Sequence, residues 1–277
     1  MFTLNCKGKL LEIESPLIMG IINATPDSFY SGNSNGDLLQ LAKKMIAGGA
    51  NLLDIGGQST RPGSKRISEQ EEMDRVLPVI EKIHYQYPEI FISIDTYQTK
   101  VAIAAVHAGA SIVNDISSGN LDENMITAVA QLKVPFICMH MQGTPDTMQK
   151  NPQYKNIVKE VIDFFISKTD ECKKAGIHDM IIDPGFGFGK SIEHNFQLLK
   201  YLDIFNIIGK PVLAGLSRKS TIYKTLGITA DDALNGTTVL NTMALMNGAS
   251  ILRVHDVKEA AEAIALYNAY KKAPPVN

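Results

Sequence analysis

Short apolar runs recur along the chain, and longer amphipathic stretches separate them. Each run spans four to six residues and shows little alternation of apolar and polar positions. That pattern is typical of parallel strands that are buried on both faces. The sequence therefore predicts eight strands, at residues 17–22, 52–55, 91–95, 111–114, 135–139, 180–183, 211–214 and 250–254.

Between these runs, apolar residues recur at helical spacing. The predicted helices lie at residues 38–46, 69–87, 100–107, 123–132, 154–174, 193–202, 233–246 and 257–271. A short β-hairpin that turns at Lys7 and Gly8 precedes the first strand. Eight strands that alternate with eight helices leave two architectures open, a doubly wound open sheet and a closed barrel.

An internal repetition favours the barrel. Gly49, Gly109, Gly176 and Gly248 precede the second, fourth, sixth and eighth strands in similar phrases such as AGGANLLD and AGASIVND. Alternate strands fill the same interior layers of a barrel, so features that recur at every second strand suit that fold. Ordinary capping of helices by glycine is the other explanation. We predict a (β/α)₈ TIM barrel with a short N-terminal β-hairpin, forming a single domain over residues 1–277.

The composition is that of an ordinary globular protein, with 45% hydrophobic residues, 20% charged residues and a formal net charge of -2. This near-neutral balance argues against nucleic-acid binding, which usually needs a strongly basic surface. The amino terminus lacks a secretory signal pattern and no apolar run reaches membrane-spanning length, so we expect a cytoplasmic protein without membrane association. Cys6, Cys138 and Cys172 form no CxxC pair, which argues against a disulfide framework or a structural zinc site.

Polar residues collect directly after the predicted strands. A buried carboxylate is costly unless it is paired, and a single one such as Asp95 could serve only as a helix cap. Polar groups at so many strand ends exceed what capping requires, and on a barrel they converge on the face that carries active sites. We therefore predict an active site from Asn23, Asp95, Asn114, Asp115, His140, Asp183, Ser217, Arg218, Lys219, Arg253, His255 and Asp256.

Two predicted loops, 23–29 and 56–63, are longer than most such connections and rich in glycine, proline and hydroxyl groups. Loops of this kind suit a clamp that closes over an anionic substrate. Arg61, Arg253 and His255 are suited to bind a phosphate or diphosphate. A mixed set of donors and acceptors suits the polar edge of a pterin-type heterocycle, namely Asp95, Asn114, Asp183 and Lys219.

The glycine-rich segment GFGFGKS at 185–191 is a weaker signal. It is not a phosphate loop, because Pro184 stands where the first glycine of that motif is required. We interpret these glycines as a turn whose backbone comes close to a flat ligand.

Taken together, eight segments closely resemble the dihydropteroate synthase family of folate synthesis. They are MGIINATPDSF, LLDIGGQSTRPG, ISIDT, VNDI, MHMQGTP, IIDPGFGFGK, GLSRKS and GTT with ILRVHD, and they cover nearly the whole chain in the order of that family. The resemblance implies a transferase that condenses dihydropterin-methyl diphosphate with p-aminobenzoate, with Mg²⁺ as cofactor, and releases dihydropteroate and diphosphate. It also implies a target for sulfonamides and a homodimer formed through the apolar helix at 233–246.

The resemblance also assigns residues to subsites. The pterin ring is held by Asp95, Asn114, Asp183 and Lys219, with Met139 and Phe188 packed around it. The diphosphate lies against Arg253 and His255, with Asn23 as the Mg²⁺ ligand. The p-aminobenzoate pocket is formed by Phe29, Thr60, Arg61, Pro62 and Ser220, with Asp27 ordering the assembled site. The residues implied in catalysis are Asp95, Asp183, Lys219, Arg253 and His255.

The sequence departs from the family pattern at Gln58, where a glutamate is common, and in the spacer that begins at Tyr30. Two alternatives stay open, a pterin-binding methyltransferase barrel that works with a corrinoid partner and a non-catalytic paralogue. The STRPG and SRKS segments and the predicted diphosphate pocket have no use in the methyltransferase. A Schiff-base lyase or isomerase would need a lysine within a strand, whereas Lys219 follows one.

Overall fold

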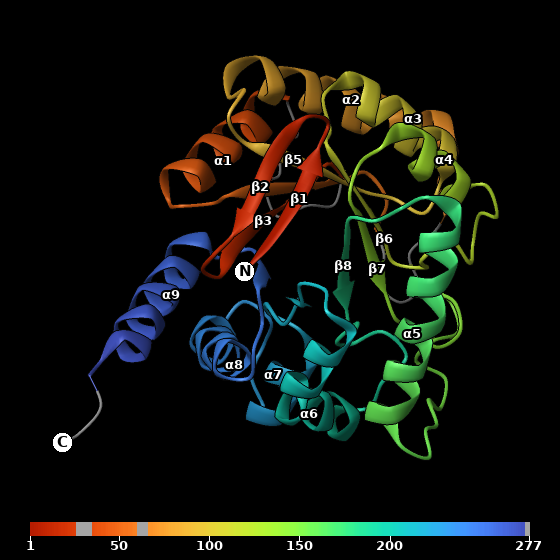
Figure 1. Ribbon diagram of the computed structural model, residues 1–277. Coiled ribbons are helices and arrows are strands. Elements are labelled where there is room, and N and C mark those ends of the chain that lie inside the picture. The colour runs from red at the N-terminus through yellow and green to blue at the C-terminus, as the bar shows by residue number, and fades with distance from the viewer. Residues whose placement is uncertain (26–34, 60–65, 275–277) are drawn as a thin grey trace.

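The fold is a barrel of parallel strands surrounded by helices, shown by a computed structural model that describes residues 1–25, 35–59 and 66–274 (Figure 1). Eight strands pair in the order β8-β7-β6-β5-β4-β3-β10-β9, and a parallel bridge between Ile182 and Val212 joins the two ends. The predicted (β/α)₈ barrel is therefore confirmed. Its strands are β3 (Leu17–Asn23), β4 (Leu52–Gly56), β5 (Phe91–Asp95), β6 (Ile112–Asp115), β7 (Phe136–Met139), β8 (Met180–Asp183), β9 (Leu213–Ala214) and β10 (Ile251–Val254).

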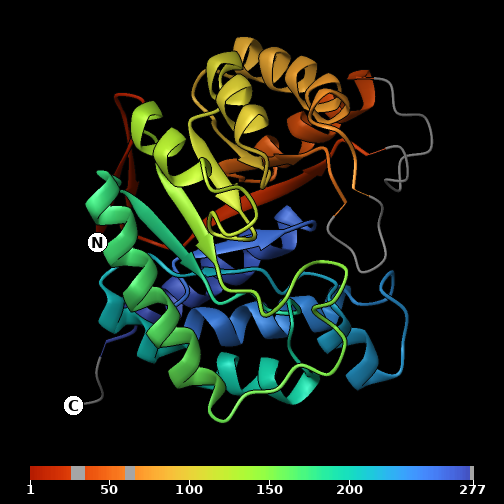
Figure 2. The same cartoon turned by 90° about the vertical axis from the view of Figure 1, so that its right-hand side faces the viewer.

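The helices cover the outside of the strands, as Figure 2 shows from a second direction. They are α1 (Asn35–Ala47), α2 (Glu69–Gln86), α3 (Thr99–Ala108), α4 (Met125–Leu132), α5 (Ile157–Ala175), α6 (Ile192–Lys200), α7 (Ser220–Leu226), α8 (Leu234–Met246) and α9 (Val257–Lys272). Isoleucine, valine and leucine side chains from the outer faces of the strands pack against these helices in one continuous core. Within the described residues, no helix is long and apolar enough to cross a membrane.

Helix α1 begins three residues earlier than predicted and α5 three residues later, and three other elements differ from the prediction in length or kind. The strand predicted at 211–214 is shorter, because Pro211 has no N–H to donate and only its carbonyl pairs, with the Ile182 amide at 3.0 Å. The helix predicted at 193–202 ends at Lys200 and continues as a 3₁₀ helix, η1 (Leu202–Ile208). Helix α7 was not predicted, since its 7 residues are too few to show a clear helical period.

The predicted N-terminal hairpin is present and closes the amino-terminal end of the barrel. Strands β1 (Phe2–Cys6) and β2 (Lys9–Ile13) pair antiparallel and turn at Lys7 and Gly8, which have positive φ values of 57° and 89°. Such a turn matches the twist of the two strands. The inner side chains of the hairpin are Leu4, Cys6, Leu11 and Ile13, and they form one apolar cluster with Leu17, Met19, Leu52, Ile112, Ile137, Ile181, Leu213 and Ile251 near the strand starts.

This packing predicts that the hairpin stabilises the barrel through one face only. Leu11 is 4% exposed within the apolar cluster, whereas its neighbour Leu10 is 58% exposed. We expect Leu11→Ala to lower the free energy of unfolding by about 2–4 kcal/mol, because it leaves a cavity at the barrel floor. The matched control Leu10→Ala should change it by less than about 0.5 kcal/mol. Urea unfolding measures both, and equal losses would contradict the assigned packing.

Candidate active site

Polar side chains from several strands come together at the carboxyl end of the barrel. Strand register places Asp95 of β5 level with Gly56 of β4 and Asn114 of β6, and Gly56 is level with Asn23 of β3. Asp183 is the last residue of β8. The barrel thus brings to one face four residues that were predicted from strand ends, Asn23, Asp95, Asn114 and Asp183.

An ionic network crosses the barrel interior below this face. The Arg253 Nε lies 2.6 Å from Asp54 Oδ2, and one Arg253 Nη lies 2.6 Å from Asp95 Oδ2. The Asn114 amide donates to the same Asp54 oxygen at 3.0 Å. Strand β10 pairs with neither β4 nor β5, so Arg253 reaches both carboxylates only through the interior. The network therefore ties β10 to the neighbouring strands β4 and β5, with which it does not pair.

Asp54 is the functional residue that the sequence prediction missed. It lies within the apolar run LLDIG and its side chain is fully buried. A carboxylate in the middle of a buried strand requires a partner, and that requirement was the available signal. Its partner is Arg253, which the resemblance assigned to the diphosphate. Two Arg253 nitrogens are bound to carboxylates, while its remaining Nη has no hydrogen-bond partner among the described residues.

Burial controls the ionisation of this network. It raises the pKa of Asp95 to about 7, although the nearby Arg253 charge acts in the opposite direction. Burial would lower the pKa of Arg253, but Asp54 and Asp95 more than offset this and hold it above its usual value. Arg253 is therefore a permanent cation, and Asp95 titrates near neutral pH.

A second cluster forms beside the first, around Asp183 and Lys219. The Asp183 carboxylate accepts a hydrogen bond from the Gly185 amide at 2.7 Å, and the Lys219 ammonium donates to the Phe186 carbonyl. Burial raises the pKa of Asp183 and lowers that of Lys219 to about 8, and in each case the partner's charge acts in the opposite direction. The pair thus presents an acceptor and a donor side by side.

An apolar wall adjoins this donor–acceptor pair. The Lys219 Nζ lies 4.7 Å from the centre of the Phe188 ring. Phe188 also packs on Met139, in a small cluster with Tyr97 and Ile116. The two predicted packing residues, Met139 and Phe188, therefore lie together. A flat ligand with a polar edge fits such a combination of apolar and charged groups.

The glycines after β8 have a different role from the predicted one. A Cβ atom on Gly185 would lie 2.0 Å from the His140 carbonyl oxygen, and one on Gly189 would lie 2.5 Å from that of Gln142. Both glycines also have positive φ values, 72° and 63°. They therefore allow this loop to press against the backbone that follows β7. Only Gly187 faces the proposed ligand region, with its Cβ position 3.3 Å from Lys219.

His255 and Ser217 form a hydrogen-bonded pair at the ends of β10 and β9. The Ser217 Oγ lies 3.0 Å from His255 Nδ1 and accepts from the His255 amide at 3.2 Å. The His255 side chain is exposed, which suits an anion ligand. Ser220 follows as the first residue of α7 and is half-buried.

Several predicted strand-end residues serve the scaffold instead. Arg218 makes a bidentate pair with Asp256 at 2.8 and 2.9 Å, and its other Nη holds the loop before α8 by donating to the Ala230 and Asp231 carbonyls at 3.1 and 2.7 Å. Asp115 accepts from the Ser117 and Gly119 amides, both at 2.7 Å, and so orders the turn before α4. These three charged groups are satisfied by the chain itself.

His140 also leaves the predicted site. It is buried against α5, where its ring lies 5.0 Å from that of Phe164 in an edge-on contact. Burial and the neighbouring Lys190 charge lower its pKa to about 3. His140 is therefore a neutral residue of the layer between the barrel and its helices.

Five predicted residues, Asp27, Phe29, Thr60, Arg61 and Pro62, lie outside the described residues. The base of the second loop is described. There the Gln58 amide accepts from the Ile67 N–H and donates to the Ser59 carbonyl, both at 2.8 Å. Glutamate, the residue common in the family, could accept but not donate.

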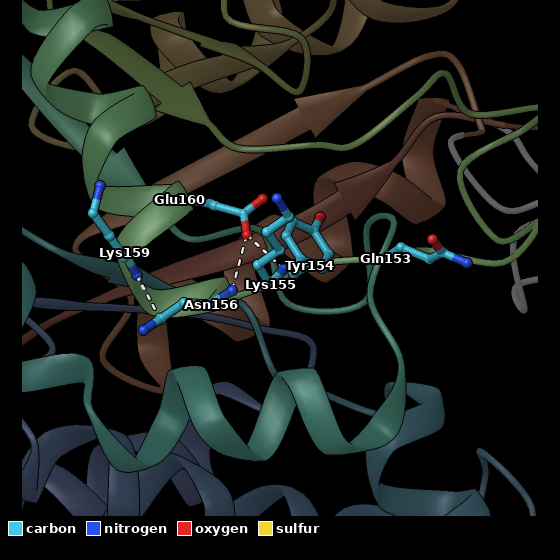
Figure 3. A pocket seen from close by; sticks show the side chains of 6 residues that line it. All are labelled: Gln153, Tyr154, Lys155, Asn156, Lys159 and Glu160. Carbon is cyan, nitrogen blue, oxygen red and sulfur yellow. Dashed lines mark hydrogen bonds between the residues drawn. The ribbon is translucent and has the colours of Figure 1, made fainter.

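A separate surface pocket lies at the amino end of α5 (Figure 3). Its wall is formed by Gln153, Tyr154, Lys155, Asn156, Lys159 and Glu160. The Glu160 carboxylate accepts from the Lys155 and Asn156 amides at 2.7 and 2.9 Å, and Asn156 caps the helix through the Lys159 amide. The N–H groups of Lys155, Asn156 and Lys159 are therefore already hydrogen-bonded within the chain and are not available to bind an anion. The pocket is a capping arrangement rather than a second active site.

Comparisons with known proteins agree with this geometry. A family model described as a pterin binding enzyme matches residues 19–255. The chain is 41% identical to the dihydropteroate synthase of Escherichia coli K12 over 95% of this chain and 94% of that protein. It is 42% identical to that of Haemophilus influenzae over 98% and 99% of the two chains.

Solved structures give the same result. A Yersinia pestis dihydropteroate synthase with a sulfonamide drug complex superposes with a TM-score of 0.94, at 40% identity over 98% of this chain and 100% of that one. A Xanthomonas albilineans dihydropteroate synthase in complex with 7,8-dihydropteroate gives 0.89, at 37% identity over 98% and 100% of the chains. This chain belongs to the pterin-binding enzymes and, within them, to the dihydropteroate synthase family.

Proposed function

We propose that the protein joins the methylene carbon of dihydropterin-methyl diphosphate to the amino nitrogen of p-aminobenzoate, giving 7,8-dihydropteroate and diphosphate. The observation that carries this proposal is that Asp183 and Lys219 both lie against Gly215 at the carboxyl end of the barrel, where a Cβ would be 3.9 Å from Asp183 Oδ2 and 3.7 Å from Lys219 Nζ, with the Phe188 ring beside Lys219. This arrangement offers an acceptor, a donor and a flat apolar wall to one heterocycle. The alternatives, a methyltransferase barrel or a non-catalytic paralogue, lack support from full-length relatives such as those of E. coli and H. influenzae, which are synthases.

The pterin ring is bound by charge and by packing. The carboxylates of Asp183 and Asp95 accept from the N–H groups of the ring, and Asn114 adds an amide. Lys219 donates to a ring acceptor, while Met139 and Phe188 cover the ring face. Hydrogen bonds with ionised partners are stronger than neutral ones and more selective when buried. This subsite therefore distinguishes a pterin from other flat rings.

In the reaction, the bond between the methylene carbon and the diphosphate oxygen breaks first. The carbon acquires positive charge, which the electron-rich pterin shares and the carboxylates of Asp95 and Asp183 stabilise. The p-aminobenzoate nitrogen then donates its lone pair to this carbon and loses a proton to solvent. No protein nucleophile is required in this scheme.

The departing diphosphate is held by cations. The exposed His255 and the remaining Nη of Arg253 lie at the end of β10, on the side of the mouth next to β3. Asn23 at the end of β3 supplies an amide oxygen for Mg²⁺. When bound, the metal neutralises diphosphate charge and makes it a better leaving group.

The residues at this end of the barrel fit an Mg²⁺ ion that binds together with the substrate diphosphate rather than in a site made by the protein alone. The described residues contain no group of three or more His, Cys, Asp or Glu side chains that could hold an ion. Mg²⁺ usually keeps several waters and binds through one or two protein oxygens together with substrate phosphates. Asn23 with diphosphate matches that mode.

The second substrate is assigned to the region between the two long loops. Of its proposed residues, Ser220 at the start of α7 lies directly after Lys219. Phe29, Thr60, Arg61 and Pro62, with Asp27 in an ordering role, stay predictions from the sequence. A cytoplasmic location is likewise a prediction.

We also propose a homodimer through α8 and α9. These helices expose apolar side chains next to one another, namely Val239, Met243, Met246, Leu266 and Tyr270, which are 43–74% exposed. The two helices pack together and share a shallow groove. An apolar face of this kind on a soluble enzyme is typical of a subunit interface.

The dimer predicts a specific response to charge. Met243→Glu should give a monomer in sedimentation equilibrium, because a buried carboxylate without a partner opposes association. Leu10→Glu, which changes an apolar side chain of similar exposure on the N-terminal hairpin (58% against 47% for Met243), should leave the wild-type mass unchanged. A monomeric wild-type protein would contradict the proposed interface.

The function itself is tested by one assay. Purified protein with both substrates and Mg²⁺ should form 7,8-dihydropteroate and diphosphate in equal amounts, measured by chromatography. Lys219→Met should reduce kcat/KM by about 100-fold or more, because it removes a buried charged donor to the pterin. Excess chelator should abolish turnover of the wild type. Absence of dihydropteroate from the wild-type reaction would refute the proposal, and full activity in chelator would remove Mg²⁺ from it.

A further inference from the structure

Lys190, the last residue of the GFGFGK segment, carries an unexpected buried ammonium group. The residue is 3% exposed. Its Nζ lies 2.9 Å from the Phe188 carbonyl oxygen, 3.0 Å from the His140 carbonyl oxygen and 3.0 Å from His140 Nδ1. These three neutral acceptors match the three N–H donors of an ammonium group. A buried lysine held in this way needs a reason, because its desolvation is costly.

The third acceptor requires His140 to be neutral. Burial lowers the pKa of His140 to about 3, and the Lys190 charge acts in the same direction. With Nδ1 accepting from the ammonium, the ring proton resides on Nε2. This explains why a histidine at a strand end lies against α5 instead of lining the active site.

The contacts of Lys190 fix the loop after β8 in place. They join the Phe188 backbone to the residue that follows β7, at the point where Gly185 makes its close approach to His140. The Tyr154 hydroxyl also holds this loop, donating to the Gly189 carbonyl at 2.9 Å. Because the Phe188 ring covers Lys219, fixing its backbone also sets the apolar wall of the pterin subsite.

The Lys190 charge also acts on Asp183. Three cations favour the ionised form of this carboxyl, Lys219, Arg253 and Lys190, and together they oppose the pKa rise that burial causes. In return, Asp183 opposes the lowering of the Lys190 pKa, which burial and the Lys219 charge bring to about 7. The geometry supports this link, because His140, whose carbonyl accepts from Lys190, donates its own N–H to the Asp183 carbonyl at 3.0 Å.

We propose that Lys190 is a positioning residue of the pterin subsite, which holds the 185–189 backbone against the end of β7 and, while it is protonated, supplies a positive charge that favours the ionised form of Asp183. This inference rests on the proposed function, since Asp183 must be ionised to accept from the N–H groups of the pterin. Lys190 does not touch the substrate. It acts through Asp183 and through Phe188.

The test compares Lys190→Met, which keeps the length of the side chain without its charge, with Lys190→Arg, which keeps the charge. Lys200→Met, an exposed lysine on α6, is the matched control. Calorimetry gives the Kd for dihydropterin-methyl diphosphate with Mg²⁺ over about pH 5.5 to 8.5, which extends to both sides of neutral pH. Thermal unfolding and the KM for p-aminobenzoate are measured on the same samples.

We expect Lys190→Met to weaken pterin-diphosphate binding about tenfold or more at neutral pH, the usual effect of losing a charged buried interaction. Its binding should also fail at a higher pH than in the wild type, because without the Lys190 charge the Asp183 pKa rises. In Lys190→Arg, the loss of binding at low pH should occur at the same pH as in the wild type. Lys200→Met should show the wild-type Kd at every pH. The KM for p-aminobenzoate should stay within about twofold in every variant, since that substrate binds elsewhere.

Two results would overturn the inference. One is an unchanged Kd and acid limb in Lys190→Met. The other is an equal loss of binding in the Met and Arg variants without a shift of the acid limb, which would mean that Lys190 only packs. If Lys190→Met does not fold, Lys190→Gln provides the same readout, because its shorter amide can donate but carries no charge. Failure of the wild type to bind the pterin diphosphate would instead refute the proposed function.

Discussion

The Arg253–Asp54 ion pair is the interaction on which the mouth of the barrel depends. A guanidinium inside a barrel is tolerated only with carboxylate partners, and Asp54 and Asp95 both lie at 2.6 Å from it. Removing one partner of a buried pair leaves an uncompensated charge and typically costs about 3–5 kcal/mol. Because Asp54 and Asp95 come from the adjacent strands β4 and β5, and Arg253 from β10, their pairing links β10 to two strands with which it does not pair. The same Asp54 oxygen orients Asn114.

The two ends of the barrel have different roles, stability at the amino-terminal end and charged groups at the carboxyl-terminal end. The amino-terminal end is filled by apolar side chains and covered by the hairpin, and it supplies stability. The carboxyl-terminal end carries the charges, and these are held by one another and by the backbone of the loop after β8. This division follows the general pattern of the fold, in which the catalytic groups lie at the carboxyl ends of the strands. In this protein two charged groups lie below the carboxyl-terminal face of the barrel. Asp54 orients Arg253 and Asn114, and Lys190 holds the backbone of Phe188.

Much of the architecture could be predicted from the sequence because buried parallel strands leave a strong apolar signal. Asp95, Asn114, Asp183 and Lys219 could be found because each ends or follows such a run. Asp54 lies inside such a run, so the sequence could indicate that it needs a partner but could not identify Arg253, which is 199 residues away. Lys190 was hidden in the same way, because its three acceptors are backbone and ring atoms of residues whose packing only the fold defines. His140, Asp115 and Arg218 occupy strand ends as the site residues do, and only their contacts reveal a scaffold role.

The central claim is that burial and pairing bring the pKa values of Asp95 and Lys219, at the carboxyl end of the barrel, close to neutral pH. The pH dependence of kcat/KM tests this claim directly. Burial raises the pKa of Asp95 to about 7, so activity should fall as pH decreases through that value and this carboxylate becomes protonated. Burial lowers the pKa of Lys219 to about 8, so activity should fall again as pH increases and the ammonium is lost. The account predicts a bell-shaped profile with its maximum between these two values. A profile that is flat from about pH 5 to pH 9, as ordinary aspartate and lysine side chains would give, would contradict it.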